Sequence, residues 1–362
     1  MGHIQKRGER RYLARWLDPD GRERAKTFTR KSDAERHLAS VEGAKLAGAY
    51  IDHANATTVV QYARQWAATR PYRPTTAARV KAYIDHHIAG TRIADRRLAA
   101  LRPSEVQAWA TDRSKVLAPV TVRLLVSLLR SIFTSAVQDR LVASNPVLRV
   151  SLPRSEKERI VPLTVLQVQA LAAAIPERCS AMVITQAGLG LRIGELLALR
   201  TVDVDFLRRT VRIEHQLTKD GKELVPPKTP RSRRTLPLPQ VVAEALAEHI
   251  SKFGIDTDLL FTTTTGKPYR QAHYGVQIFA AAVRKAGLPA GTTPHDLRHH
   301  FASVLLYAGE SVVAVAERLG HENAALVLRT YGHLMPDSED RTRRAIDDAW
   351  TVDGLQTDSA HG

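Results

Sequence analysis

The sequence predicts a multidomain, mainly α protein with a small β-sheet at its amino-terminal end. Its 362 residues exceed the usual size of one hydrophobic core. Apolar residues recur at three-to-four spacing between Thr58 and Val150, as in helices. A short basic segment near residue 10 instead has the pattern of a strand, a turn and a returning strand. We therefore expect two or three domains, the first of them a small sheet with a helix.

The chain is strongly basic, with 53 Lys and Arg against 37 Asp and Glu and a net charge of +16. Basic residues spread over several domains indicate a polyanionic partner, for which nucleic acid is the leading candidate. The longest apolar run, Leu124–Leu129, is too short to cross a bilayer, and the amino terminus has no apolar signal core. One cysteine, Cys179, cannot form an internal disulfide and is expected to pack in an apolar helix. We expect a soluble protein of the bacterial cytoplasm, associated with the nucleoid and not with a membrane.

Residues 1–55 are expected to form a small basic domain. Residues 10–17 predict a strand, Asp18–Gly21 a turn and residues 22–28 a returning strand, and Ser32–Glu35 has the pattern of a capping box that opens a helix. A basic strand face would suit a DNA groove, whereas a solvated edge hairpin is the alternative. The candidate DNA-binding residues on that face are Arg11, Arg15, Arg22, Arg24 and Lys26.

Residues 56–152 are expected to form a second, helical domain of four or five helices. Its apolar residues follow a helical period, and Pro103 and Pro119 lie near expected helix starts, where a missing N–H costs nothing. A charged residue on a helix is usually only a solvated face. The candidate phosphate contacts are Arg73, Arg79, Lys81, Arg123 and Arg130.

Residues 153–350 are expected to form the third domain, which combines helices with strands around Val211–Ile213 and on both sides of Lys228. The charged, proline-bearing segment 151–160 before it predicts a linker. The acidic segment 351–362 predicts a flexible tail. This third domain carries the polar groups that bear chemistry.

Cleavage of a DNA phosphodiester without water needs a nucleophile, a group that neutralises the pentacoordinate phosphorane and an acid for the departing 5′ oxygen. Guanidinium groups can hold the phosphate oxygens, an imidazole can accept a proton near neutral pH, and a flexible ammonium can donate one. A tyrosine hydroxyl can attack, provided that its proton is removed. Residues of these kinds are Arg192, Lys228, His295, Arg298, His321 and Tyr331.

The spacing of His295 and Arg298 places both on one side of a helix, while Leu297 points to the core. His299, four residues after His295, invites a metal interpretation. No cysteine or carboxylate at ligand spacing completes a metal site, and Arg298 would repel a cation. Tyr307 is the nearest rival of Tyr331, but the apolar residues around it predict a core helix.

Arg192 is expected at the start of a leucine-rich helix, where Glu195 could hold its guanidinium; a surface Arg–Glu pair is the alternative. Lys228 lies between prolines, in a turn that could reach a DNA groove. A basic loop that only binds the DNA backbone is the alternative there, with Lys219 and Lys222 as alternative acids. The DNA-binding candidates that come after Lys228 in the sequence are Arg231, Arg233 and Arg234.

The local sequences around these residues resemble those of the tyrosine recombinases, and the basic amino-terminal hairpin resembles the arm-binding domain of phage integrases. The matching segments are Gly188–Glu195, Pro227–Thr229, His295–His299, Leu319–His321 and Thr330–His333. The resemblance implies a core-binding domain before the catalytic domain. It also implies that Tyr331 is the nucleophile of a 3′-phosphotyrosyl intermediate.

By the same resemblance, His295 is the general base and His321 a phosphate-binding or proton-sharing partner. Arg192 and Arg298 hold the phosphate, and Lys228 is the acid. The reaction needs no metal, ATP or other cofactor. The implied partners are core-type and arm-type attachment sites on double-stranded DNA and three further copies in a homo-tetramer; a host DNA-bending protein and an excision factor are accessory candidates.

Two other functions compete with integration or excision of DNA. A metal-dependent nuclease or transposase would need convergent carboxylates; the candidate pair is Asp203 with Asp205, which is expected in a loop before a strand. A non-catalytic DNA-binding regulator would satisfy every basic feature equally. It would leave the six reactive residue types without an explanation.

Overall fold

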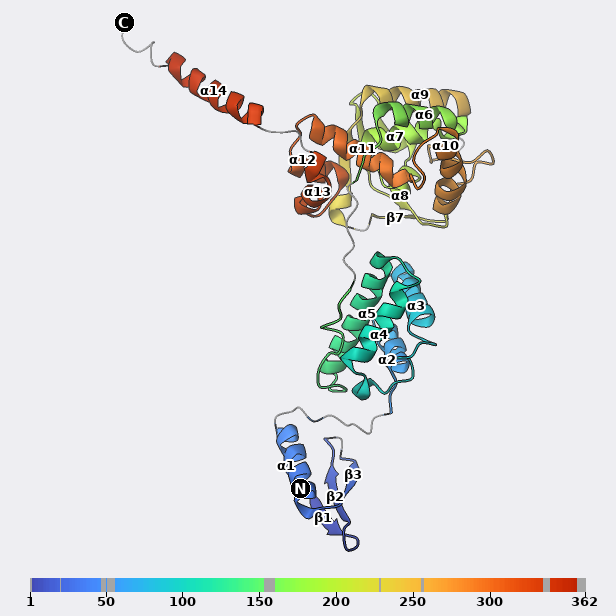
Figure 1. Ribbon diagram of the computed structural model, residues 1–362. Helices are drawn as coiled ribbons and strands as arrows, with labels where there is room; N and C mark the ends of the chain where they lie inside the picture. The colour runs from blue at the N-terminus through green and yellow to red at the C-terminus, as the bar shows by residue number, and fades with distance from the viewer. Residues whose placement is uncertain are drawn as a thin grey trace. The chain divides into compact units, whose positions relative to one another are not determined.

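The computed structural model describes residues 2–19, 21–46, 50, 56–152, 160–227, 229–254, 257–334 and 339–356 (Figure 1). The chain divides into two compact units, Met1–Lys157 and Glu158–Gly362. The first unit contains the small sheet and a group of helices, and the second contains the α+β part. The predicted fold class is confirmed.

The amino-terminal sheet is antiparallel in the order β1-β2-β3. Its strands are β1 (His3–Lys6), β2 (Tyr12–Leu17) and β3 (Glu23–Phe28), and α1 (Lys31–Leu46) covers one face. The predicted hairpin is confirmed, whereas β1 was not predicted. The helix begins at Lys31, so Ser32 lies inside it and not before it.

The basic residues of this sheet do not share one face, which corrects the prediction. Residues directly opposite each other point to the same side, and successive residues alternate. Ala14 pairs with Lys26 and Trp16 with Arg24 on the face toward α1, where Ala14 is fully buried. Arg15 lies on the other face and forms an ion pair with Glu23 at 2.9 Å. Arg11 and Arg22 lie outside the strands and are exposed.

Four helices of the first unit pack around one hydrophobic core that includes Val59, Trp109, Leu125 and Phe133. Prolines occupy the first position of three of these helices, as predicted for two of them, because that position has no intrahelical N–H partner to lose. The helices are α2 (Val59–Ala68), α3 (Pro74–His87), α4 (Pro103–Ser114) and α5 (Pro119–Gln138).

Within the described ranges, α5 is the one helix with the length and hydropathy of a membrane span. Leu125, Leu129, Ile132 and Phe133 on this helix are fully buried in the helical core. Burial in such a core accounts for its apolar composition without a membrane.

The second unit is built around α7 (Ser180–Leu189), which packs against α6 (Val165–Ala174), α9 (Gln240–Phe253) and α11 (Pro294–Tyr307) (Figure 1). A three-stranded antiparallel sheet in the order β4-β5-β8 and a hairpin of β6 and β7 complete it. The strands are β4 (Val204–Asp205), β5 (Thr210–Ile213), β6 (Gln216–Leu217), β7 (Leu224–Val225) and β8 (Arg234–Pro237). The other helices are α8 (Ile193–Leu196), α10 (Ala280–Lys285), α12 (Val312–Leu319), α13 (Ala324–Tyr331), α14 (Glu339–Gln356) and the π-helix η5 (His273–Phe279). The 3₁₀ turns are η2 (Glu177–Cys179), η3 (Thr201–Asp203), η4 (Pro230–Ser232) and η6 (Gly332–Leu334).

Gly190 joins α7 to the segment that carries Arg192. It ends the helix in the left-handed conformation, with a φ of 62°, and a Cβ there would collide with the ring of Phe301 in α11. Glycine therefore permits both the turn and the close approach of α11. These two features bring the start of α8 next to the middle of α11.

The carboxyl-terminal helix α14 continues to Gln356, so the segment predicted as a tail from Thr351 begins inside a helix. Residues 357–362, the linker segment 153–159 and Lys228 lie outside the described residues.

Candidate active site

Arg192 lies at the N-cap of α8 and is held by Glu195, as expected from their spacing. Its backbone N–H donates to Glu195 Oε2 at 3.0 Å, and its guanidinium donates to Oε1 at 2.7 Å and to the carbonyl of Gly320 at 3.1 Å. The Arg192 side chain remains 37% exposed, whereas that of Glu195 is 2% exposed. Glu195 thus orients a guanidinium that stays accessible.

Arg234 occupies the other side of the same carboxylate, which differs from its predicted role as a DNA contact. Its Nη2 donates to Glu195 Oε2 at 3.0 Å and its Nε to the carbonyl of Arg318 at 2.7 Å. The side chain is 6% exposed, so it supports the site from inside. Burial opposes ionisation of Glu195, yet Arg234 and Arg192 hold the pKa of this carboxyl below its usual range.

Arg298 is the most deeply buried cation of the site, with 1% of its surface exposed. It donates to the carbonyls of Gly190 and Leu319, at 2.6 Å each, and to His321 Nε2 at 2.8 Å. Burial and the nearby charge of Arg192 lower the pKa of Arg298 to about 9, so it remains charged at neutral pH. Leu297, as predicted, points to the core.

His321 must be neutral in this arrangement. A guanidinium can only donate, so Nε2 of His321 accepts and the ring proton lies on Nδ1. Burial and the charge of Arg298 lower the pKa of His321 to about 4, in agreement with a neutral ring. Nδ1 is buried and has no hydrogen-bond partner among the described residues.

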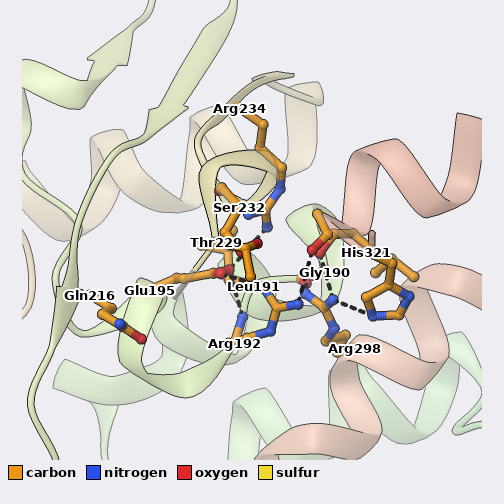
Figure 2. A network of polar contacts seen from close by, with 12 residues as sticks. Gly190, Leu191, Arg192, Glu195, Gln216, Thr229, Ser232, Arg234, Arg298 and His321 are labelled. Carbon is orange, nitrogen blue, oxygen red and sulfur yellow. Dashed lines mark hydrogen bonds and ion pairs between the residues drawn. The ribbon is translucent and has the colours of Figure 1, made fainter. Parts of the chain in front are cut away.

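Together these groups form an anion-binding cluster (Figure 2). The guanidinium groups of Arg192, Arg234 and Arg298 influence one another's charge, and the carboxylate of Glu195 compensates only one of the three. Uncompensated buried charge is costly unless a counter-ion is bound. The cluster therefore favours a ligand with about two negative charges or a strongly charged transition state.

A pocket of about 490 Å³ opens beside this cluster, between the segment 231–236 and the helices α12 and α13. Apolar residues Leu236 and Val313 contribute to its walls together with basic ones. Arg231 donates to the carbonyl of Glu322, and Arg231 and Arg233 are exposed. The basic lining residues are Arg231, Arg233, Arg234, Arg318 and His321.

Tyr331 ends α13, and its side chain is buried, with 2% of the residue exposed. Its hydroxyl lies 2.6 Å from Nδ1 of His299. Burial raises the pKa of Tyr331 to about 12, although the charge of Arg298 opposes this. Tyr307, expected in a core helix, ends α11 with 78% of its surface exposed. It lies 12 residues, or roughly 18 Å of helix, from His295.

His299 is the residue of this site that the sequence interpretation missed. From the sequence alone, its spacing of four residues from His295 suggests only a metal site. That spacing places the two rings 4.6 Å apart on one face of α11. His295 itself is exposed, and desolvation by the surrounding protein, with the charges of His299 and Arg298, lowers its pKa to about 4.

Asp203 and Cys179 both lie in buried, structural surroundings. Asp203 is buried and forms an ion pair with Arg200 at 2.9 Å. No group of three or more His, Cys, Asp or Glu side chains with the arrangement of a metal site occurs among the described residues. Cys179 is 1% exposed beside the hydroxyl of Tyr269, and burial raises its thiol pKa, which confirms the packing role.

Known proteins resemble this chain over most of its length. The phage integrase family model matches residues 162–337. A prophage phiRv2 integrase of Mycobacterium tuberculosis is 29% identical over 349 residues, which cover 92% of this chain and 91% of the relative. The solved Tn1549 transposon integrase in complex with a circular intermediate DNA has a TM-score of 0.70 at 26% identity, over 81% of this chain and 99% of that chain. A lambda integrase tetramer bound to a Holliday junction has a TM-score of 0.60 over 90% of this chain and 94% of that chain; at 19% identity this likeness concerns the fold alone.

Proposed function

This chain belongs to the phage integrase family of tyrosine recombinases, and from that membership we propose how its side chains cut and rejoin DNA. It is a site-specific recombinase of a phage or mobile element, which integrates or excises DNA. One observation carries the proposal for the site. A buried tyrosine, Tyr331, ends a helix beside a cluster in which one carboxylate offsets only one of three guanidinium charges.

Arg192 and Arg298 hold the non-bridging oxygens of the scissile phosphate. Arg192 is oriented by Glu195 and is partly exposed, and Arg298 is fixed by two carbonyls at opposite ends of its guanidinium. Guanidinium groups match phosphate geometry and are charged at neutral pH. His321 contributes as well, because its buried Nδ1–H has no protein acceptor among the described residues and a phosphate oxygen would supply one.

Tyr331 then attacks the phosphorus. A bond forms between its Oη and phosphorus, the bond from phosphorus to the 5′ oxygen breaks, and the phenol proton leaves to a base. The product is a 3′-phosphotyrosyl link that conserves the energy of the phosphodiester, so that a 5′ hydroxyl of a second duplex can reverse the step. For this reason the reaction needs neither ATP nor metal.

Lys228 is proposed as the acid that protonates the 5′ oxygen. Its side chain lies outside the described residues, and the proposal rests on its position in the sequence between β7 and η4. The residues that follow are arranged around the anion cluster, since Ser232 and Arg234 connect this segment to the site (Figure 2). An ammonium on a flexible stem can follow a departing oxygen.

DNA is the partner of the whole chain. We propose that residues 1–55 bind arm-type sites and residues 56–152 bind core-type sites, and that four copies act together on two duplexes inside the bacterial cell. Exposed Arg11, Arg22, Arg231 and Arg233 are suited to backbone contacts. A host DNA-bending protein and an excision factor would control the direction of the reaction.

A covalent-capture experiment tests the proposed chemistry. The full chain is incubated in EDTA with a pool of random-sequence duplexes that contain nicks, and adducts that survive denaturation are sequenced to identify the cleaved site. We expect an adduct with the wild type and none with Tyr331→Phe, whose DNA binding persists because only one oxygen is removed. Cleavage that EDTA abolishes would indicate a metal-dependent nuclease. Binding without an adduct under every condition would indicate a regulator and contradict the proposal.

A further inference from the structure

The hydroxyl of Tyr331 has a specific protein partner, and it is not the histidine that the family resemblance singles out. Nδ1 of His299 lies 2.6 Å from Tyr331 Oη, and the two rings meet edge to face with centroids 5.5 Å apart. His299 comes from the middle of α11 and Tyr331 from the end of α13. His295 lies one turn earlier on α11, where its ring packs against that of His299.

In the hydrogen bond between Tyr331 and His299, the tyrosine is the donor, as removal of its proton by the histidine requires. Burial lowers the pKa of His299, with Asp296 opposing and Arg298 reinforcing the shift, so the ring is neutral at pH 7. Tyr331 is protonated at the same pH, because burial raises its pKa to about 12. The phenol therefore donates and Nδ1 accepts, which leaves the ring proton of His299 on Nε2.

We propose that His299 is the general base of the reaction, the residue that takes the proton from Tyr331 as its oxygen attacks the phosphorus. The inference rests on the proposed function, in which Tyr331 is the nucleophile. In cleavage, the Oη–P bond forms, the P–O5′ bond breaks, the phenol proton passes to Nδ1 and an acid, proposed as Lys228, supplies the proton of the 5′ hydroxyl. In rejoining, the O5′–P bond forms as the 5′ hydroxyl gives its proton back to the group that acted as the acid, the Oη–P bond breaks, and His299 returns its proton to the phenol oxygen. His295 and His321 are then left to bind phosphate.

The surroundings of His299 fit this exchange. Titratable groups that face it are His295, Asp296 and Arg298 on its own helix and Tyr331 on α13. From the neighbouring elements, His321 is engaged by Arg298, and His333 of η6 contacts the carbonyl of Ile160. The charge of Asp296 stabilises the imidazolium that forms, whereas the charge of Arg298 destabilises it and so favours return of the proton.

The test uses a nicked duplex obtained by the covalent capture described above, with the 5′ oxygen at the cleavage position replaced by sulfur. Sulfur leaves without an acid, so the cleavage rate reports removal of the tyrosine proton alone. We expect His299→Ala to cleave at least about 100-fold more slowly than the wild type at pH 7. Its rate should rise about tenfold between pH 7 and pH 8, where Arg298 is still charged, because hydroxide replaces the base, whereas the wild type stays nearly flat.

A second variant separates proton transfer from positioning. His299→Gln keeps a polar acceptor for the Tyr331 hydroxyl but cannot take up the proton, so we expect it to bind the duplex like the wild type and to cleave as slowly as His299→Ala. Near-normal cleavage by His299→Gln would assign a positioning role instead and overturn the inference. A steep pH dependence in His295→Ala but not in either His299 variant would assign the base to His295. If the wild type itself forms no adduct, the proposed function fails and not this step alone.

Discussion

At the scale of single residues, the site depends on groups whose protonation state is fixed by their neighbours. Arg298 donates to His321 Nε2, so that ring is neutral in the folded protein. Protonation of His321 at low pH would remove the acceptor of this hydrogen bond and place a second cation beside Arg298. The folded state should therefore be weakened by acid at this position.

We predict that His321 makes the catalytic unit less stable as the pH falls. Its folded pKa of about 4 lies below the usual 6.5, so its contribution is fully present above pH 6.5 and is lost progressively toward pH 4. The shift corresponds to at most about 3 kcal/mol, which solvent screening of a partly exposed ring reduces. Urea unfolding of the full chain at pH 7.5, 6 and 5 measures the effect.

The matched variant is His321→Gln, which offers Arg298 an acceptor that does not titrate. Its free energy of unfolding should fall less steeply with pH than that of the wild type over the same interval. Parallel curves for the two proteins would show that His321 does not carry the acid sensitivity.

At the scale of elements, the buried carboxylate of Glu195 connects two segments. It holds Arg192 at the start of α8 and Arg234 at the start of β8, and Arg234 in turn donates to the last turn of α12. The strand β8 is thereby fixed to Arg192, the arginine that we propose to bind phosphate. Gly190 makes the matching connection between α7 and α11.

We predict that Arg234→Ala destabilises the chain by about 3 kcal/mol or more, because it leaves a buried carboxylate with one of its two cations. Thermal or urea unfolding checks this value. The control is Arg233→Ala, the adjacent and exposed arginine, which should change stability by less than about 0.5 kcal/mol but weaken DNA binding. If Arg234→Ala instead lost much of its DNA affinity and none of its stability, Arg234 would be a DNA contact and not a structural residue.

The sequence predicted what local spacing determines. Arg192 and Glu195 are three residues apart and form the expected ion pair, and His295 and Arg298 lie one turn apart on α11, as their spacing requires. Contacts between distant segments were not predictable in the same way. The hydrogen bond that the Tyr331 hydroxyl donates to His299 joins residues 32 positions apart, and the ion pair of Arg234 with Glu195 joins residues 39 positions apart. Both contacts depend on how distant segments pack. In the amino-terminal sheet, successive side chains along β2 and β3 alternate between the two faces, and this alternation alone places Arg15 and Arg24 on opposite faces.

At the scale of the whole molecule, the basic character is distributed and not confined to the site. Residues 1–55 contain twelve Lys and Arg and eight Asp and Glu, so they hold only four of the sixteen net positive charges. The hydrophobic core of the first unit's helices begins at Val59 and includes no residue of the amino-terminal sheet. General attraction to DNA should therefore survive removal of the sheet.

From this distribution we predict that deletion of residues 1–55 abolishes recombination between full attachment sites and leaves covalent cleavage of core sites within about threefold of the wild type. Gel assays of recombination on supercoiled DNA and of adduct formation on the captured nicked duplex measure the two activities separately. The triple variant Arg11→Ala, Arg22→Ala and Lys26→Ala removes exposed charge without removing the fold, and it should show a milder loss of recombination with the same intact cleavage. The truncated chain keeps a net charge of +12, which supports non-specific DNA binding but cannot replace the recognition of an arm site. Full recombination by the truncated chain would therefore mean that the sheet binds no arm site.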